Sequence, residues 1–349
     1  MKNKILVIGG AGFIGINATR FFLKKKFDII IFDNFSRKGT KTNLKLLEKE
    51  KKYFNKFKFI LGDIRNFKSI SKVIKKEKPN LILHLAGQVA VTNSIKNPRN
   101  DLENNINGTF NILESTRLYS NKSFIIYSST NKVYGKINYP MKKVKNRWVF
   151  KSKKIKNGID ENKNLEFYSP YGCSKGAADQ YVLDYSRIYD LNTSVVRQSC
   201  IYGENQFGIE DQGWISWFII AFLLKKEVTI YGDGCQVRDI LFVDDLSALY
   251  LKIFRNKRKT KGHVFNAGGG LKNSISIIDL LNFLKKNKKL NLRYKFDKER
   301  QGDQKIFISN NSKLFKMIKW KPKINYKEGL NKIFKWTANN LDLIKSNIR

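Results

Sequence analysis

Short apolar runs alternate with amphipathic stretches along the first half of the chain. The apolar runs predict buried strands, whereas the stretches between them place their apolar residues at helical spacing. This alternation is typical of an α/β fold in which helices cover both faces of a doubly wound parallel sheet, as in the Rossmann fold. The predicted strands are residues 4–8, 29–32, 57–61, 81–85, 124–128 and 193–197.

The alternation loosens after Arg197, which predicts a smaller C-terminal domain assembled from two segments. Between these two segments, residues 240–243 and 264–266 are expected to return to the main sheet. The predicted division places residues 1–203 and about 237–267 in the larger domain, and residues 204–236 and 268–349 in the smaller one.

Residues 136–166 interrupt the alternation with a lysine-rich, weakly periodic insertion. A solvated surface loop and a lid over a binding site are both compatible with such a segment, and the sequence leaves the choice open. The helix that follows is better defined, because Ser169 can cap its first turn and Pro170 suits its first position.

A glycine-rich segment, Gly9-Gly-Ala-Gly-Phe-Ile-Gly15, joins the first predicted strand to the first predicted helix. Its glycines permit a tight turn, close approach of the backbone to a pyrophosphate, and packing of the helix on the sheet. The positive end of the helix would face the phosphates. The second strand ends in Asp33, where a carboxylate can accept hydrogen bonds from an adenosine ribose. This order of elements predicts a dinucleotide site.

Tyr171 and Lys175 form the candidate catalytic pair, because a spacing of four residues places them on one face of the predicted helix. A free tyrosine has a pKa near ~10 and is a poor base at neutral pH, whereas an adjacent ammonium favours the phenolate. Tyr171 is therefore expected to take a proton from an alcohol. Thr130, which follows the strand at residues 124–128, is expected to hold that alcohol.

The chain is strongly basic, with 68 Lys and Arg residues against 29 Asp and Glu residues and a net charge of +39. Most of these cations are lysines spread along the whole chain, whereas a nucleic-acid reader more often clusters its charge and uses arginine forks. We therefore expect a cationic surface without a specific nucleic-acid site. Its field would help to collect anionic substrates.

Three scattered cysteines and two histidines predict neither a disulfide framework nor a metal site. The first predicted strand begins almost at the first residue, and no apolar stretch approaches the ~20 residues of a membrane span. These features predict a reduced, cytoplasmic protein without a membrane partner.

The order of the motifs resembles that of the extended short-chain dehydrogenase/reductases, the NAD-dependent epimerases and dehydratases of nucleotide sugars. The matching segments are GGAGFIG (9–15), GDIR (62–65), HLAGQ (84–88), SST (128–130), Tyr171 with Lys175, Arg197 with Tyr202-Gly203, Tyr231 to Asp239, and Arg300 to Asp303. They cover essentially the full length. The resemblance implies a Rossmann domain that binds NAD, a nucleotide-diphosphate sugar as the partner, and a homo-oligomer.

The resemblance also assigns binding residues. The implied cofactor-binding residues are Gly9, Gly12, Phe13, Ile14, Gly15, Asp33, Asn34, Ser36, Arg37, Asp63, Ile64, Leu85, Ala86, Gly87, Gln88, Asn105, Tyr171 and Lys175. The implied substrate-binding residues are Gln88, Thr130, Asn131, Cys200, Arg238 and Arg300. The two arginines would clamp the pyrophosphate, a role that suits a planar bidentate cation.

Asn131 and Lys132 discriminate among the activities of this family. The 4,6-dehydratases and related decarboxylases carry a carboxylate one or two places after the hydroxyl residue, and this chain has none there. The resemblance therefore implies epimerisation, in which one carbon is oxidised and then reduced again. Cys200 departs from the family pattern, which has asparagine at this place, so that contact with the substrate is lost or altered.

Longer strings narrow the resemblance to the 2-epimerases of CDP-linked 3,6-dideoxyhexoses. They include SPYGCSKGAADQY (169–181) and DQGWISWF (211–218). This implies a CDP-3,6-dideoxyhexose that is inverted at C2, whereas the residues alone leave the carbon and the base open. A C4-epimerase of a UDP-sugar, a nucleotide-sugar reductase, and a non-catalytic regulator that binds a cofactor or nucleic acid remain alternatives.

Overall fold

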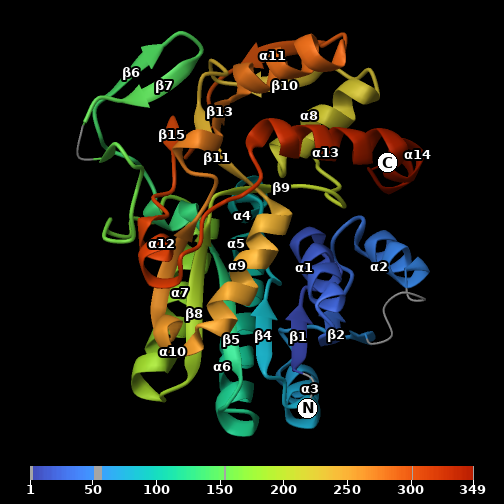
Figure 1. The fold of residues 1–349 in the computed structure, drawn as a ribbon, viewed down its shortest axis with the longest axis vertical. Coiled ribbons are helices and arrows are strands. Elements are labelled where there is room, and N and C mark those ends of the chain that lie inside the picture. Colours follow the sequence, from blue (N-terminus) through green and yellow to red (C-terminus); the bar gives the residue numbers. More distant parts are fainter. Residues whose placement is uncertain (1–2, 51–56, 153–154, 301, 349) are drawn as a thin grey trace.

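Seven parallel strands form the central sheet of the computed structural model, which describes residues 3–50, 57–152, 155–300 and 302–348. The strands are β1 (Lys4–Ile8), β2 (Asp28–Asp33), β3 (Phe57–Leu61), β4 (Leu81–His84), β5 (Phe124–Thr130), β8 (Asn192–Gln198) and β12 (His263–Ala267). Their order across the sheet is β12-β8-β5-β4-β1-β2-β3. The expected α/β fold with a doubly wound parallel sheet is confirmed, and the strand order reverses at β1 (Figure 1).

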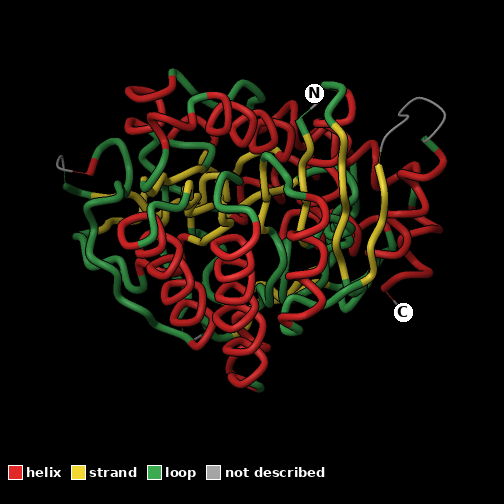
Figure 2. Tube along the Cα trace, turned by 90° about the horizontal axis from the view of Figure 1, so that it is seen from below, coloured by secondary structure: helices red, strands yellow, loops and turns green. Residues whose placement is uncertain are grey.

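Helices cover both faces of this sheet (Figure 2). One face packs against α1 (Phe13–Lys24), α2 (Thr40–Lys49), α9 (Val243–Arg255) and α12 (Ser312–Ile318), and the other against α3 (Phe67–Glu77), α6 (Gly108–Tyr119) and α7 (Pro170–Ile188). The inner strands β1, β4 and β5 are mainly apolar because both of their faces are buried, whereas the edge strand β3 is partly exposed. In β1, Ile5 and Val7 join the first cluster, whereas Leu6 and Ile8 join the second.

Short helical segments lie between the main elements of the larger lobe. They are α4 (Val91–Lys96), α5 (Pro98–Asp101), the π-helix η2 (Leu102–Asn107), the 3-10 helix η3 (Asn131–Tyr134) and α10 (Lys257–Thr260). The π-helix contains Asn105, and such segments are frequent at functional sites.

A smaller lobe lies beyond the carboxyl ends of the parallel strands, in the upper part of Figure 1. Its strands are β9 (Cys200–Tyr202), β10 (Val228–Tyr231), β11 (Val237–Phe242), β13 (Ser274–Ser276), β14 (Tyr294–Asp297) and β15 (Ile306–Phe307). Its helical segments are α8 (Trp214–Leu223), η5 (Leu271–Asn273), α11 (Ile277–Lys288), α13 (Tyr326–Asn339) and α14 (Leu341–Ile348).

One expected strand of the main sheet lies elsewhere. Residues 264–266 do return to the main sheet as part of β12, which pairs with β8. Residues 240–242 instead lie in β11, which pairs with β9, β13 and β15 in the smaller lobe. An apolar run predicts a strand but not the strand with which it pairs. The sequence pattern therefore cannot tell a strand of the main sheet, such as β12, from a strand of the smaller lobe, such as β11. The exact domain division stays a prediction.

The insertion at residues 136–166 contains an antiparallel hairpin formed by β6 (Met141–Val144) and β7 (Arg147–Phe150). Trp148 and Phe150 pack beside the buried cluster of Val237, Ile306 and Ile308 in the smaller lobe. Part of the insertion is therefore packed rather than solvated, and none of its described residues lines the cavity of the candidate site.

Helix α7 begins as expected, with Pro170 at its first turn and the Ser169 hydroxyl accepting a hydrogen bond from the Gly172 N–H at 3.0 Å. Its apolar residues are only partly buried: Val182 and Tyr185 lie in the core, whereas Tyr181 and Ile188 are 43% and 66% exposed.

A buried ion pair joins α7 to β8. Arg197 donates from Nε and a terminal nitrogen to the two carboxylate oxygens of Asp179, at 2.8 and 3.0 Å. Arg197 also donates to the Tyr134 hydroxyl at 3.1 Å, and Asp179 accepts a hydrogen bond from Ser129 at 2.9 Å. Asp179 has no exposed side-chain area and Arg197 has 4%, so both charges depend on these partners.

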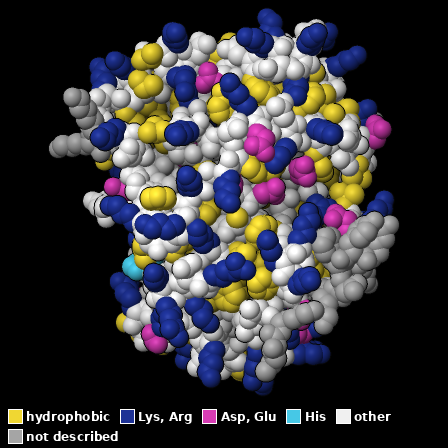
Figure 3. All heavy atoms as spheres, viewed as in Figure 1, with side chains coloured by type: hydrophobic (Ala, Val, Ile, Leu, Met, Phe, Trp, Pro, Cys, Tyr) yellow, Lys and Arg dark blue, Asp and Glu magenta, His cyan; other side chains and the backbone are white. Residues whose placement is uncertain are grey.

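Lysine and arginine side chains are spread over the whole of the face drawn in Figure 3, with acidic side chains among them. No large single patch of positive charge stands out on this face, which agrees with the dispersed lysines of the sequence. Within the described residues, no helix combines the length and apolar character required to cross a membrane.

Replacing Asp179 by Ala is expected to lower the free energy of unfolding by about 3–5 kcal/mol, because the Arg197 guanidinium would stay buried without a counter-charge. Asp184→Ala on the same helix is the matched control, since its pair with Arg187 is exposed and contributes less than about 1 kcal/mol. Guanidinium unfolding followed by circular dichroism measures both variants. Equal losses of unfolding free energy in the two variants would show that the buried ion pair stabilises the fold no more than the exposed one.

Candidate active site

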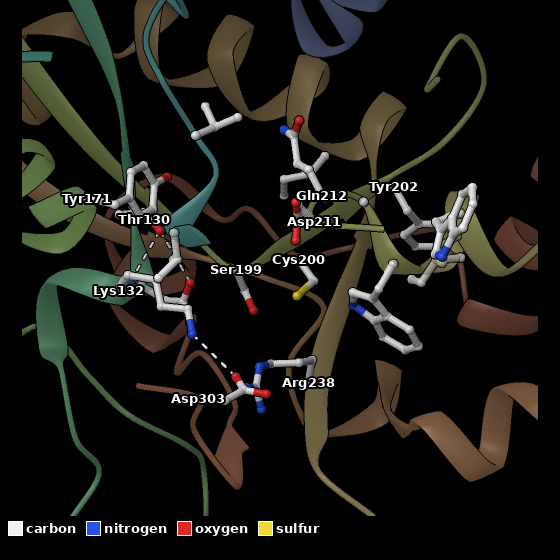
Figure 4. A pocket seen from close by; sticks show the side chains of 18 of the residues that line it. Thr130, Lys132, Tyr171, Ser199, Cys200, Tyr202, Asp211, Gln212, Arg238 and Asp303 are labelled. Atoms are coloured by element: carbon white, nitrogen blue, oxygen red, sulfur yellow. Dashed lines mark hydrogen bonds and ion pairs between the residues drawn. The ribbon is translucent and has the colours of Figure 1, made fainter. Parts of the chain in front are cut away.

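A cavity of about 560 Å³ lies between the two lobes. Its wall combines the end of β5, the first turns of α7, the segments around β9 and α8, and the region from β10 to β11. The cavity therefore opens at the carboxyl edge of the parallel sheet, where sheets of this type bind ligands. Figure 4 shows the side chains that project into it.

Tyr171, Lys175 and Thr130 all line this cavity. Tyr171 and Lys175 lie one turn apart on α7 and are 8% and 4% exposed. The Lys175 ammonium lies over the Tyr127 ring at 4.2 Å, and Thr130 stands at the end of β5 beside Tyr171 (Figure 4). The Thr130 hydroxyl also accepts a hydrogen bond from the Lys132 N–H at 3.2 Å, which begins η3. The structure brings together the three residues that the sequence selected.

Burial dominates the protonation of this pair. Burial raises the pKa of Tyr171 to about 12; the neighbouring Thr130 hydroxyl and the Arg37 charge lower this pKa, and the Asp101 charge raises it. Burial lowers the pKa of Lys175 to about 7, although the carboxylates of Asp179 and Asp101 raise it. Burial therefore opposes the charged form of both groups, and the phenolate expected beside Lys175 stays a prediction.

Asn131 and Lys132 each contact a residue from the segment at 303–304. The Asn131 amide donates to the Gln304 side chain at 3.2 Å, and the Lys132 ammonium lies 3.4 Å from Asp303. Arg238 donates to the same Asp303 carboxylate at 2.6 Å (Figure 4). Asp303 therefore sits between two cations, and their charges lower its pKa to about 2 against the effect of burial.

Arg300 lies in the part of the cavity wall that contains Tyr231, Glu210 and Asp211. Its guanidinium stacks on the Tyr231 ring at 3.9 Å and lies 3.5 Å from Asp211. The Tyr231 hydroxyl donates to Glu210 at 2.8 Å. Arg238 and Arg300 thus both face the cavity, each with a carboxylate beside it.

The glycine-rich turn has the close packing that the sequence predicted. A Cβ atom at Gly15 would lie 2.2 Å from the Gly9 carbonyl oxygen, and Gly9 has a positive φ of 78°. Gly12 starts α1 without any side-chain cap, so the N–H groups of the first turn, from Phe13 and Ile14 onward, are left for a ligand. Phe13, Ile14 and also Leu85 line the cavity.

Asp33 closes this turn from the end of β2. Its carboxylate accepts hydrogen bonds from the Ala11 N–H at 3.0 Å and the Phe35 N–H at 2.8 Å. Burial raises the pKa of Asp33, and these backbone donors lower it. Asn34 donates to Asp63 at 3.0 Å, which places the two at neighbouring strand ends. These residues form a continuous polar edge next to the glycine turn.

The remaining predicted cofactor residues divide into two groups. Ser36 and Arg37 lie on the exposed loop after β2, and Ile64 is buried below the Asp63 turn. Gln88 and Asn105 support the segment Ala86-Gly87: the Gln88 N–H donates to Asn105 at 2.9 Å, and the Gln88 side chain bonds Ala90 and Asp101. None of these residues is among those that line the cavity, and the binding roles of all the predicted cofactor and substrate residues stay predictions.

Several cavity residues were not selected from the sequence. They include Ser199, Gln206, Trp217, Tyr231, Gln236 and Asp303. They come from the smaller lobe or its borders, where no regular pattern identifies an inward face. The strings DQGWISWF, Tyr231 to Asp239 and Arg300 to Asp303 contain Trp217, Tyr231, Gln236 and Asp303, but as motifs they give these four residues no individual role.

Comparisons with known proteins agree over nearly the full length. The family described as GDP-mannose 4,6 dehydratase matches residues 6–333. A CDP-paratose 2-epimerase of Salmonella typhi is 44% identical over 341 residues, which cover 96% of this chain and 99% of that protein. A UDP-glucuronate 4-epimerase of Thermodesulfobacterium geofontis is 30% identical over 342 residues, with 98% of both chains covered.

Solved structures with the same fold also span the whole chain. A UDP-glucose 4-epimerase of Thermotoga maritima with UDP-glucose superposes with a TM-score of 0.82 at 28% identity, covering 97% of this chain and 99% of that one. A UDP-glucuronic acid 4-epimerase of Bacillus cereus in complex with UDP-glucuronic acid and NAD gives a TM-score of 0.82 at 25% identity, covering 96% and 99%.

Replacing Lys175 by Met is expected to stabilise the protein at neutral pH. The folded-state pKa of Lys175 is about 7, whereas the unfolded chain keeps a value near ~10.4, so the unfolded state binds more protons between these values. The cost of burying this amine is therefore fully present below pH 7 and fades as the pH rises toward ~10. The variant should gain unfolding free energy most at neutral pH and progressively less above it.

Guanidinium unfolding of both proteins at several pH values from about 7 to about 10 measures this difference. The exposed Lys72→Met on α3 is the control, because it removes a lysine that is not buried. A gain that did not change with pH would contradict the assignment of a desolvated amine.

Proposed function

This chain belongs to the GDP-mannose 4,6-dehydratase family of extended short-chain dehydrogenase/reductases, and from that premise we propose that it is an NAD-dependent epimerase of a nucleotide sugar. The substrate we propose is CDP-paratose, with inversion at C2 to give CDP-tyvelose. The observation that carries the proposal is a tyrosine–lysine–threonine cluster in a cavity whose carboxylates are all paired with cations or hydrogen-bond donors.

The residues around the glycine turn fit NAD. The uncapped start of α1 suits a pyrophosphate, and the Asp33 carboxylate suits the free hydroxyls of an adenosine ribose. Asp33 would also repel a 2′-phosphate, although the nearby Arg37 is cationic. When bound, NAD supplies a hydride acceptor whose oxidised ring carries a positive charge.

Tyr171 acts on the proton of the reacting hydroxyl. Thr130 holds that hydroxyl toward the phenol oxygen, and Tyr171 removes its proton as the carbon is oxidised. A positive charge placed beside Tyr171 lowers its pKa from the high value that burial causes, which makes the phenolate accessible. The resulting keto-sugar then rotates in the cavity, so that its opposite face points toward the cofactor. Tyr171 returns the proton when the carbon is reduced on its opposite face.

The same cavity disfavours dehydration. Elimination of water from a hexose needs a carboxylic acid that can donate a proton to the leaving hydroxyl. Asn131 and Lys132 carry no acid, and Asp303 has a pKa of about 2, so it remains ionised at neutral pH. Glu210 and Asp211 are both engaged with the region around Arg300 and Tyr231. The chain thus keeps the oxidation chemistry of its family without the acid that elimination uses.

The substrate assignment is supported by the 44% identical CDP-paratose 2-epimerase and by the cavity wall. Arg238 and Arg300 offer cations to a diphosphate. Cys200, at the place of the family asparagine, presents a thiol, and burial raises its pKa so that it stays uncharged. A thiol makes weaker hydrogen bonds than an amide, which suits a sugar that lacks a hydroxyl group.

We also propose that the enzyme is a homo-oligomer built on α6 and α7. These helices leave Phe110, Tyr181 and Ile188 between 41% and 66% exposed. The Phe110 and Tyr181 rings meet edge to face at 6.0 Å, so the two helices form one apolar surface. A second copy of the same surface, related by a twofold axis, would bury it.

Deuterium at C2 of the CDP-sugar is expected to remain on that carbon in the product, because hydride is removed and returned at the same position. Solvent deuterium should not enter, whereas an enolisation route would exchange this hydrogen with water. NMR of the purified protein incubated with CDP-, UDP-, GDP- and dTDP-sugars measures both the substrate and the label. Epimerisation only at C4 of a UDP-hexose would instead establish the alternative carried by the UDP-sugar relatives.

Tyr171→Phe is expected to lower kcat by about 10²–10⁴, the range for loss of a positioned acid or base. NAD should remain bound, since the glycine turn and Asp33 are untouched. Tyr294→Phe on β14 is the control, because this tyrosine is exposed and lies outside both the cavity and the proposed oligomer surface. Comparable turnover by the two variants would remove Tyr171 from the mechanism.

A further inference from the structure

The hairpin β6–β7 has no role in the proposed chemistry, because none of its residues lines the cavity. It nevertheless makes a dense set of specific contacts with the smaller lobe. Figure 1 shows it beside β13 and β15, far from the sheet strand β5 that leads into it. Several of these contacts are made with one short segment, the turn at residues 232–236 between β10 and β11.

Trp148 and Lys143 hold this turn from the hairpin side. The Trp148 N–H donates to the Cys235 carbonyl at 3.0 Å, and its indole N–H donates to Asp233 at 3.1 Å. The Lys143 ammonium donates to the same Asp233 oxygen at 3.2 Å. The Lys305 ammonium lies over the face of the Trp148 ring, 4.6 Å from its centroid, and adds a cation–π contact that holds the indole.

Arg147 provides a second anchor next to the first. It lies 3.1 Å from Asp279 and donates to the Ser274 hydroxyl at 3.0 Å. Asp279 and Ser276 form the capping box that starts α11. The following helix is also tied to the turn, since the Ile278 N–H donates to the Gly234 carbonyl at 3.0 Å. The hairpin, the turn and the start of α11 therefore form one hydrogen-bonded unit.

The turn carries cavity residues at both of its ends. Tyr231, on which Arg300 stacks, precedes it, and Arg238, which bonds Asp303, follows it. Gly232 and Gly234 have φ values of 81° and 69°, and glycine gives a turn little stiffness of its own. Asp233 stiffens the turn, because one of its carboxylate oxygens accepts a hydrogen bond from the Cys235 N–H at 2.9 Å. Its other carboxylate oxygen is the one that the hairpin binds.

We propose that the β6–β7 hairpin is a positioning element for the nucleotide, acting through Trp148 and Asp233 on the spacing of Tyr231 and Arg238. The inference rests on the proposed function in one respect, namely that these two residues contact a nucleoside diphosphate. By holding a glycine-rich turn in its binding geometry, the hairpin lowers the ordering cost of binding. Trp148 and Asp233 are thus positioning residues, and neither touches the reacting carbon.

Trp148→Phe tests the proposal, because it keeps an aromatic ring under Lys305 and removes only the indole donor. Asp233→Asn is the partner variant: its amide oxygen can still cap Cys235, while its NH₂ group cannot accept from Trp148. Each variant should raise the Kd for CDP and the KM for the nucleotide sugar about three- to tenfold, the scale of one lost hydrogen bond. The double variant should lose little more than either single one.

Controls separate positioning from general damage. Lys142→Ala is matched to the hairpin, since Lys142 is exposed on the same strand as Lys143 and should bind CDP like the wild type. In the Trp148 and Asp233 variants, kcat and NAD binding should stay within about twofold of the wild type. Unchanged CDP affinity, or parallel losses in CDP binding, NAD binding and melting temperature, would each overturn the proposal.

Nucleotide binding by the wild-type protein tests the proposed function independently of the variants. If the wild type binds UDP rather than CDP, the same variants are titrated with UDP by calorimetry, and the same three- to tenfold loss is expected. A wild type that binds no nucleoside diphosphate would overturn both the proposed function and this inference. Nucleotide binding by the wild type with no effect of either variant overturns the inference alone.

Discussion

The bidentate ion pair between Arg197 and Asp179 fixes helix α7 to the sheet. It joins α7 to β8, and through Ser129 and Tyr134 it extends to the end of β5 and to η3. The Tyr134 hydroxyl continues the network to Asn266 on β12 at 2.7 Å. Tyr171 and Thr130 come from different elements, so their relative position depends on this network. Because both charges are buried, the geometry holds only while every partner is in place.

Regular periodicity explains why most of the larger lobe was predictable. Strands buried on both faces are read from their continuous apolar runs, and the glycine turn is identified by its place between strand and helix. The ion pair itself was not predictable, because residues 179 and 197 are joined only by the folded structure. The same holds for β11, whose apolar run reads like any other strand but pairs in the smaller lobe. Partner choice depends on tertiary packing, which periodicity does not record.

The candidate site shows the same limit in chemical terms. The spacing of Tyr171 and Lys175 correctly placed both residues on one helix and in one cavity. The spacing argument did not include burial, which raises the pKa of Tyr171 and lowers the pKa of Lys175, and the role of this pair in proton transfer stays a prediction. The sequence comparison showed only that Asn131 and Lys132 stand where the dehydratases of the family carry a carboxylate. Their partners Gln304 and Asp303 became visible only with the fold.

Those four residues behave as two matched pairs, amide with amide and ammonium with carboxylate, contributed by segments more than a hundred positions apart. Substitution of the first segment alone would break both pairs. An acidic side chain in place of Lys132 would repel the Asp303 carboxylate as a like charge. Asp303 would then keep its ion pair with Arg238 but lose the one with Lys132. The residues that follow Thr130 are thus packed against side chains of the C-terminal segment, so that a change at position 131 or 132 also changes the surroundings of Gln304 and Asp303.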